Sequence, residues 1–134
     1  MGQQENIRII EELYSAFGRG DLPFILNMVA EDVEWQHPRP EDIPWGGTRR
    51  GREEVAQFFA AIGERLEVEL FNPEQFVVQD DRVIVFGHER MRTRSAGRVY
   101  RVDWVHAFRL RAGKIVEFRE YTDTATIIEA LVQS

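Results

Sequence analysis

The sequence predicts a single α+β domain that spans residues 1–134, with helices in its first half and an antiparallel sheet in its second. In the first half, apolar residues recur three and four positions apart, which is the spacing of amphipathic helices. From residue 67 onward they alternate with polar residues, as in strands that have one buried face. A chain of 134 residues with 43% hydrophobic and 30% charged residues suits one globular domain. Helices segregated from an antiparallel sheet define the α+β class.

Three helices are predicted before the sheet. Residues 6–18 carry the first, which two glycines end. Asp21 can cap a short second helix over residues 22–29, which has a proline in its first turn. The third covers residues 51–66. The apolar positions of the first and third helices are Ile7, Ile10, Leu13, Tyr14 and Phe17, and Val55, Phe58, Phe59, Ile62 and Leu66.

A short strand and a long loop lie between the second and third helices. After a turn at Glu31 and Asp32, residues 33–37 alternate like a strand, which a proline ends. The loop over residues 39–50 holds Trp45 beside two glycines, which indicates a lid or rim that packs when closed. The strand residues that share one face are Val33, Trp35 and His37.

Four strands complete the sheet, and a short helix follows them. The first of these strands is interrupted near Asn72 and Pro73. A short glycine-containing connection joins the last two in a hairpin. Asp123 can cap the final helix, which reaches residue 131. The strands are predicted over residues 67–78, 82–93, 99–110 and 115–121.

The hairpin carries ionisable side chains on an apolar face. His106 shares a face with Trp104 and Phe108, and Glu120 shares one with Phe118. An ionisable group on such a face must be paired or have a function, because burying it unpaired is costly. This pattern is the central clue to function.

Four candidate site residues also have a purely structural interpretation. His106 could be a core histidine bonded to Glu120. His37 could cap a strand end, Glu89 could be solvated at the mouth of a pocket, and Glu120 could pair with an arginine on an adjacent strand.

Composition excludes several function classes. A net charge of −6 argues against nucleic acid as a partner. The sequence has no cysteine, so no disulfide or thiol nucleophile can form. The N-terminus is polar, and no apolar run approaches the ~20 residues of a membrane span. We therefore expect a cytoplasmic protein without a membrane partner.

No cofactor or metal is expected. The sequence has no phosphate-binding glycine loop and no dinucleotide fingerprint. A metal held by two histidines and two glutamates is a competing idea, but no local ligand motif such as HExxH supports it.

Five motifs resemble a known family. They are YxAFxxGDL from Tyr14, DVxWxxP from Asp32, GTxxGxxxVxxFF from Gly47, WVHxFRLxxGKI from Trp104 and REYTD from Arg119. In order and spacing they resemble the SnoaL-like group of the nuclear transport factor 2-like, or ketosteroid-isomerase-like, superfamily. The resemblance covers essentially the whole chain.

The resemblance implies a fold and a range of functions. The family fold is a curved antiparallel sheet wrapped around three helices, which makes a cone with one open end; here a short C-terminal helix is added. Many members are homodimers through the outer sheet face. Members include isomerases, polyketide cyclases, epoxide hydrolases, dehydratases and non-catalytic binders, so the fold alone does not decide the activity.

Two family activities can be compared residue by residue. The catalytic base of ketosteroid isomerase matches His37 and its oxyanion-hole aspartate matches His106, whereas its tyrosine matches Leu13, next to Tyr14. The two aspartates of limonene-epoxide hydrolase match Glu89 and Glu120. The arginine of that hydrolase matches Gly87, so neither activity is carried over with its full residue set.

These observations predict one cone pocket and a cofactor-free enzyme. We expect acid–base chemistry of the isomerase, cyclase or lyase type, or hydrolysis, on a hydrophobic carbonyl or cyclic substrate. The alternatives are a non-catalytic binder of hydrophobic small molecules and a dimeric scaffold. Homodimerisation through the outer sheet face is expected from the resemblance. The predicted catalytic residues are His37, His106, Glu120 and Glu89, and the predicted substrate-binding residues are Leu13, Tyr14, Phe17, Trp35, Trp45, Met91, Trp104 and Phe118.

Overall fold

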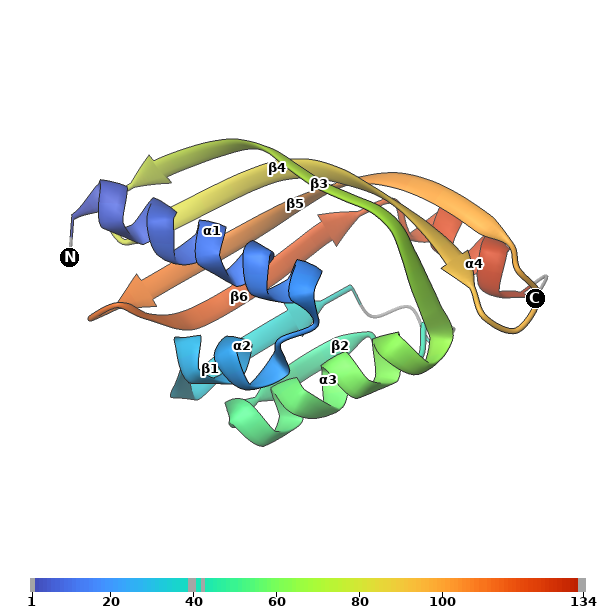
Figure 1. Ribbon diagram of the computed structural model, residues 1–134, viewed down its shortest axis with the longest axis horizontal. Helices are drawn as coiled ribbons and strands as arrows, with labels where there is room; N and C mark the ends of the chain where they lie inside the picture. Colours follow the sequence, from blue (N-terminus) through green and yellow to red (C-terminus); the bar gives the residue numbers. More distant parts are fainter. Residues whose placement is uncertain (1, 39–40, 42, 133–134) are drawn as a thin grey trace.

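A curved six-stranded sheet that arches over helix α1 dominates the computed structural model, which describes residues 2–38, 41 and 43–132 (Figure 1). The strand order is β2-β1-β6-β5-β4-β3. α2 and α3 lie beside β1 and β2, and α4 lies at the opposite end of the sheet (Figure 1). The helices are α1 (Gln3–Arg19), α2 (Leu22–Met28), α3 (Gly51–Arg65) and α4 (Thr124–Val132), and the strands are β1 (Val29–His37), β2 (Gly47–Arg50), β3 (Leu66–Gln79), β4 (Arg82–Thr93), β5 (Val99–Arg111) and β6 (Lys114–Thr122).

The α+β cone fold is confirmed, with one parallel strand pair. β3, β4, β5 and β6 form a continuous antiparallel sheet, and β2 pairs antiparallel with β1. β1 pairs with β6 in parallel, which makes the sheet mixed. Parallel neighbours need a long crossover, and α3 together with β3, β4 and β5 supplies it here.

The helix ends follow their predicted signals. Gly20 ends α1 in the left-handed conformation, with a φ of 69°, where a residue with a side chain would be strained. The Asp21 side chain accepts a hydrogen bond of 3.2 Å from the backbone N–H of Phe24 and so caps α2. Among the described helices, none is long and apolar enough to cross a membrane.

Two local predictions around β1 are wrong. The expected turn at Glu31 and Asp32 is part of β1, which already begins at Val29. The pairing with β6 shifts register between Val29 and Glu34, and this irregularity interrupts the alternation by which a strand is recognised. In the expected loop over residues 39–50, Gly47–Arg50 forms β2. Positions 39, 40 and 42 of that loop lie outside the described residues.

The predicted interruption at Asn72 and Pro73 is a bulge inside one long strand. β3 continues through both residues, and its pairing with β4 shifts register between Pro73 and Gln75. Proline, which has no backbone N–H, is tolerated there because β3 is an edge strand. On its outer side no neighbouring strand needs a backbone donor.

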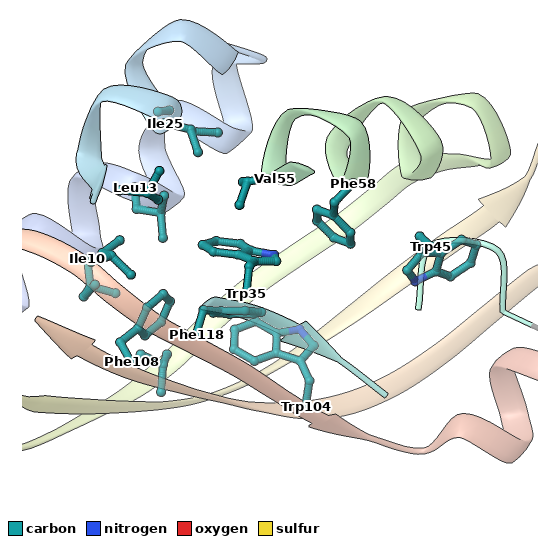
Figure 2. Packing of buried hydrophobic residues seen from close by; sticks show 14 of the residues in the cluster. Ile10, Leu13, Ile25, Trp35, Trp45, Val55, Phe58, Trp104, Phe108 and Phe118 are labelled. Carbon is teal, nitrogen blue, oxygen red and sulfur yellow. The ribbon is translucent and has the colours of Figure 1, made fainter. Parts of the chain in front are cut away.

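The inner face of the sheet forms the hydrophobic core with α1 and α3 (Figure 2). Every second residue of β5 from Tyr100 to Leu110 is buried, as the alternation predicts. Trp35 of β1 stacks on Phe118 of β6, with 4.1 Å between ring centroids. Trp45 packs at some distance from this pair (Figure 2).

Candidate functional site

A cavity of about 60 Å³ lies between α1, α3 and the inner face of the sheet. Ten of the twelve predicted site residues line it; Trp45 and Trp104 do not. The catalytic and substrate-binding roles of all twelve residues stay predictions. The predicted residues at the cavity are Leu13, Tyr14, Phe17, Trp35, His37, Glu89, Met91, His106, Phe118 and Glu120, and the pattern did not single out Ile25, Phe58, Phe59, Ile62, Phe71 and Phe108, which also line it.

Four polar side chains of this cavity form a connected chain. The Tyr14 hydroxyl lies 2.9 Å from Nδ1 of His106, and Nε2 of His106 lies 2.9 Å from Oε2 of Glu120. Oε1 of the same carboxylate lies 3.7 Å from Nε2 of His37. Glu120 therefore stands between two imidazoles and contacts one with each of its oxygens.

Strand register and aromatic packing hold these groups in place. His106 and Glu120 are directly opposite in the β5–β6 pair, so their side chains meet on the inner face. Trp104 stacks on His106 with 3.9 Å between ring centroids and 13° between planes. His37, at the end of β1, stacks on Phe58 of α3 at 4.2 Å. Each imidazole is thus fixed by a ring on one side and by Glu120 at its edge.

The connected residues Tyr14, Glu120 and His37 have different protonation states, because burial and neighbouring charges shift their pKa values in different directions. Burial lowers the pKa of His37 to about 4; the Glu120 carboxylate opposes the shift, whereas His106 and Arg49 add to it. Burial raises the pKa of Glu120, but His37 and His106 outweigh it, and the net shift is downward. Burial and the charge of Glu120 raise the pKa of Tyr14. At neutral pH, His37 is uncharged, Glu120 is a carboxylate and Tyr14 keeps its proton.

His37 also has an unused acceptor. Its Nδ1 is buried and has no hydrogen-bond partner within the described part of the chain. The carboxylate at the other ring nitrogen favours the tautomer with hydrogen on Nε2, which leaves a lone pair on Nδ1. An imidazole with a free lone pair in an apolar cavity can accept a proton from a bound molecule.

Glu89 is buried rather than solvated. Its side chain on β4 is 8% exposed and hydrogen-bonds the Tyr100 hydroxyl. Burial, and to a lesser degree the charge of Glu120, raises the pKa of Glu89 to about 8, against the effect of the Tyr100 bond. The cavity therefore holds one ionised and one protonated carboxyl group at neutral pH, a division of roles suited to acid–base chemistry. Sequence reasoning missed Tyr100, although it lies on the buried parity of β5.

Replacing Glu89 by glutamine is expected to stabilise the fold at pH 8 by about 1–3 kcal/mol and much less at pH 5. Because the folded-state pKa is raised, the unfolded chain releases this proton at a lower pH than the folded chain, and stability falls as pH rises from about 4.5 to about 8. Urea unfolding of both proteins at the two pH values measures the difference. If the wild type and Glu89→Gln had the same free energy of unfolding at pH 5 and at pH 8, a buried, protonated Glu89 would be contradicted.

The position that matches the arginine of limonene-epoxide hydrolase cannot hold a side chain. A Cβ atom on Gly87 would lie 2.5 Å from the Trp104 ring and 2.6 Å from the Asn72 carbonyl oxygen. The indole thus occupies the space of the missing side chain. Of that hydrolase set, only the two carboxyl groups of Glu89 and Glu120 are present.

Metal binding has no structural support in the described residues. They contain no group of three or more histidine, aspartate or glutamate side chains arranged to hold a metal ion. Glu120, with a histidine at each oxygen, resembles an orienting carboxylate more than a ligand.

Comparison with known proteins places the chain among small proteins of the same fold. The SnoaL-like domain matches residues 10–118. Two NTF2-like proteins, from Burkholderia xenovorans LB400 and Burkholderia pseudomallei K96243, are 37% and 32% identical, both with a TM-score of 0.89 and with 98% of each chain covered. TerC, co-crystallized with polyporic acid, is 31% identical, with a TM-score of 0.83 and with 97% of this chain and 99% of TerC covered. No curated protein matches the sequence.

Proposed function

This chain belongs to the SnoaL-like domain family, and we propose that it binds a hydrophobic carbonyl compound in its cone cavity and catalyses proton transfer at the carbon next to the carbonyl. The observation that carries the proposal is the hydrogen-bonded and ionic series Tyr14–His106–Glu120–His37 in a cavity whose other lining residues, apart from Glu89, are apolar. Polar groups that converge in an apolar pocket are the ordinary arrangement of a small-molecule site. The reaction requires a base and a group that stabilises the enolate oxygen.

His37 is the proposed base. Nδ1 takes the proton from the substrate carbon, and the electron pair of the broken C–H bond moves into the carbonyl group to form an enolate. Glu120 stabilises the imidazolium that results and keeps the ring oriented. The proton returns to the same carbon, to another carbon in an isomerisation, or to solvent.

Tyr14 and Glu89 are the proposed donors to the enolate oxygen. The Tyr14 hydroxyl lines the cavity 2.9 Å from Nδ1 of His106; where Nδ1 carries a hydrogen, the Tyr14 oxygen accepts it and the phenolic hydrogen is free to face the substrate. Glu89, protonated at neutral pH, supplies a second O–H donor. Donors placed in a cavity from which water is excluded stabilise developing charge more than they would in water.

A small organic ligand is also supported by similarity. TerC was co-crystallized with polyporic acid, and its chain matches this one nearly end to end. Binding without catalysis is the second candidate, since the same cavity would serve it.

Deuterium exchange tests the proposal. The protein is incubated in deuterium oxide with 2-acetylnaphthalene and with 2-tetralone, two ketones with an aromatic body, and NMR follows the loss of the hydrogens next to the carbonyl. We expect exchange above the buffer rate with at least one of them. Binding without exchange would favour the second candidate. If the protein neither binds the ketones nor exchanges their hydrogens, a carbonyl-binding site is contradicted.

We further propose that two copies pair through the outer sheet face and that the protein works in the cytosol. Phe86, Val105 and Tyr121 are neighbours across β4, β5 and β6, and Phe86 and Tyr121 are 43% and 49% exposed. Light scattering is expected to give twice the monomer mass, because a row of apolar side chains on one sheet face favours self-association. A monomer at all concentrations would contradict it.

A further inference from the structure

The inner cavity is too small for a whole hydrophobic substrate. Its volume of about 60 Å³ holds on the order of four water molecules, which is room for a carbonyl group and its neighbours but not for a ring system. The rest of the substrate must lie elsewhere. One route outward follows residues that the cavity shares with a larger groove.

A groove of about 320 Å³ continues the cavity toward the surface. It opens between the α1–α2 connection, α3 and the region where β3 begins and β4 ends. The cavity and the groove share Phe17, Ile25, Phe59, Ile62 and Met91, so a ligand can occupy both at once. The groove is the place for the body of the substrate.

Arg94 is the one ionisable residue among the described residues that line this groove. It lies in the turn after β4, where its Nε donates a hydrogen bond of 2.9 Å to the carbonyl of Gly63 on α3, and its backbone N–H donates one of 2.9 Å to the carbonyl of Arg65. The remaining lining is apolar or glycine: Gly20, Leu22, Ala60, Gly63, Leu66 and Val68, besides the five shared residues.

Among the described residues, the terminal nitrogens of Arg94 have no anionic partner. Two arginines on the same strand end, Arg90 and Arg92, both pair with Glu69. Arg94 forms no ion pair with any carboxylate in the described part of the chain. Its side chain is anchored at one nitrogen and leaves the outer edge of the guanidinium for a ligand.

From this arrangement we infer that the substrate carries an anionic group, a carboxylate or its equivalent, at the end remote from the reacting carbonyl, and that Arg94 binds it. The inference rests on the proposed function, because it assumes that the carbonyl end lies in the inner cavity. A guanidinium binds a carboxylate through two parallel N–H donors. Such a local cation offsets the repulsion that a net charge of −6 exerts on an anionic ligand.

Two matched ketones test the inference. 2-Acetylnaphthalene is neutral, and 6-acetyl-2-naphthoate carries a carboxylate at the far end of the same ring system. Dissociation constants are measured by calorimetry for the wild type, Arg94→Gln, Arg94→Lys and the control Arg98→Gln, which removes an exposed charge in the same turn but outside the groove.

We expect the wild type to bind the anionic ketone about tenfold more tightly than the neutral one. Arg94→Gln is expected to abolish this preference without changing the affinity for the neutral ketone. Arg94→Lys should keep part of it, and Arg98→Gln all of it. Added salt should weaken the preference, since the contact is at the surface.

Equal wild-type affinity for the two ketones, or a preference that survives in Arg94→Gln, would overturn the inference. If the neutral ketone still exchanges its hydrogens in that case, the proposed function stands and only the role of Arg94 is wrong. If neither ketone binds, the proposed function fails first, and the inference fails with it.

Discussion

Replacing His37 by glutamine is expected to slow deuterium exchange into a bound ketone by about 100-fold or more. Glutamine has a similar size and can still donate a hydrogen bond toward Glu120, but it cannot accept a proton at neutral pH. The stacking of the side chain on Phe58 is largely kept, so the fold should be preserved. Exchange followed by NMR and unfolding followed by circular dichroism measure the two effects separately.

The pH dependence identifies the group that is lost. Because the pKa of His37 is lowered to about 4, its free-base form is present at neutral pH and is protonated only as pH falls through about 4. The wild-type rate should therefore decline on the acid side near pH 4 rather than near the usual histidine value. In His37→Gln this acid limb should disappear from the residual rate.

A second histidine provides the control. His88 lies on the opposite face of β4, where it contacts Glu74, and it does not line the cavity. His88→Gln should leave both the exchange rate and its pH profile unchanged. If His37→Gln exchanges as fast as the wild type, another group is the base, and Glu120 is the next to test.

Alternation predicted the face of the site residues that lie on strands, but not the distances between them. Alternation on two strands of one hairpin is enough to bring His106 and Glu120 to the same side, because the period of a strand is two. The parallel pairing of β1 with β6 brings His37 close to Glu120. It therefore also decides which carboxylate oxygen faces which imidazole. No local pattern specifies that pairing.

Bulges and packing account for the features that sequence reasoning missed. Phe71 lines the cavity because β3 shifts register on both sides of it, which changes the parity of its side chains. Trp104 lies on the predicted face, yet it stacks beneath His106 because Gly87 opposite has no side chain. A pattern of buried positions does not reveal whether a ring borders a cavity or supports the residue that does.

Replacing Trp104 by alanine is expected to lower the free energy of unfolding by about 3–5 kcal/mol. The side chain is 2% exposed and stacks on both His106 and Phe71, so its removal leaves a cavity behind the site. Urea unfolding measures the loss. Trp104→Phe should cost less, because it keeps a ring on His106 and removes a buried Nε1 that has no partner among the described residues.

Trp104→Ala also tests whether the indole holds His106 in place, separately from its contribution to the stability of the fold. Without the stacked indole, the imidazole of His106 can rotate, and its contacts with Tyr14 and Glu120 should loosen. Two-bond proton–nitrogen NMR spectra of the histidines are expected to show this as a changed or averaged tautomer signal. Trp45→Ala is the matched control, because Trp45 is also buried, at 4% exposed, and does not line the cavity. It should destabilise the fold comparably and leave the His106 signal unchanged. An unchanged signal in Trp104→Ala as well would mean that Glu120 and Tyr14 alone hold His106, and that Trp104 contributes stability but not orientation.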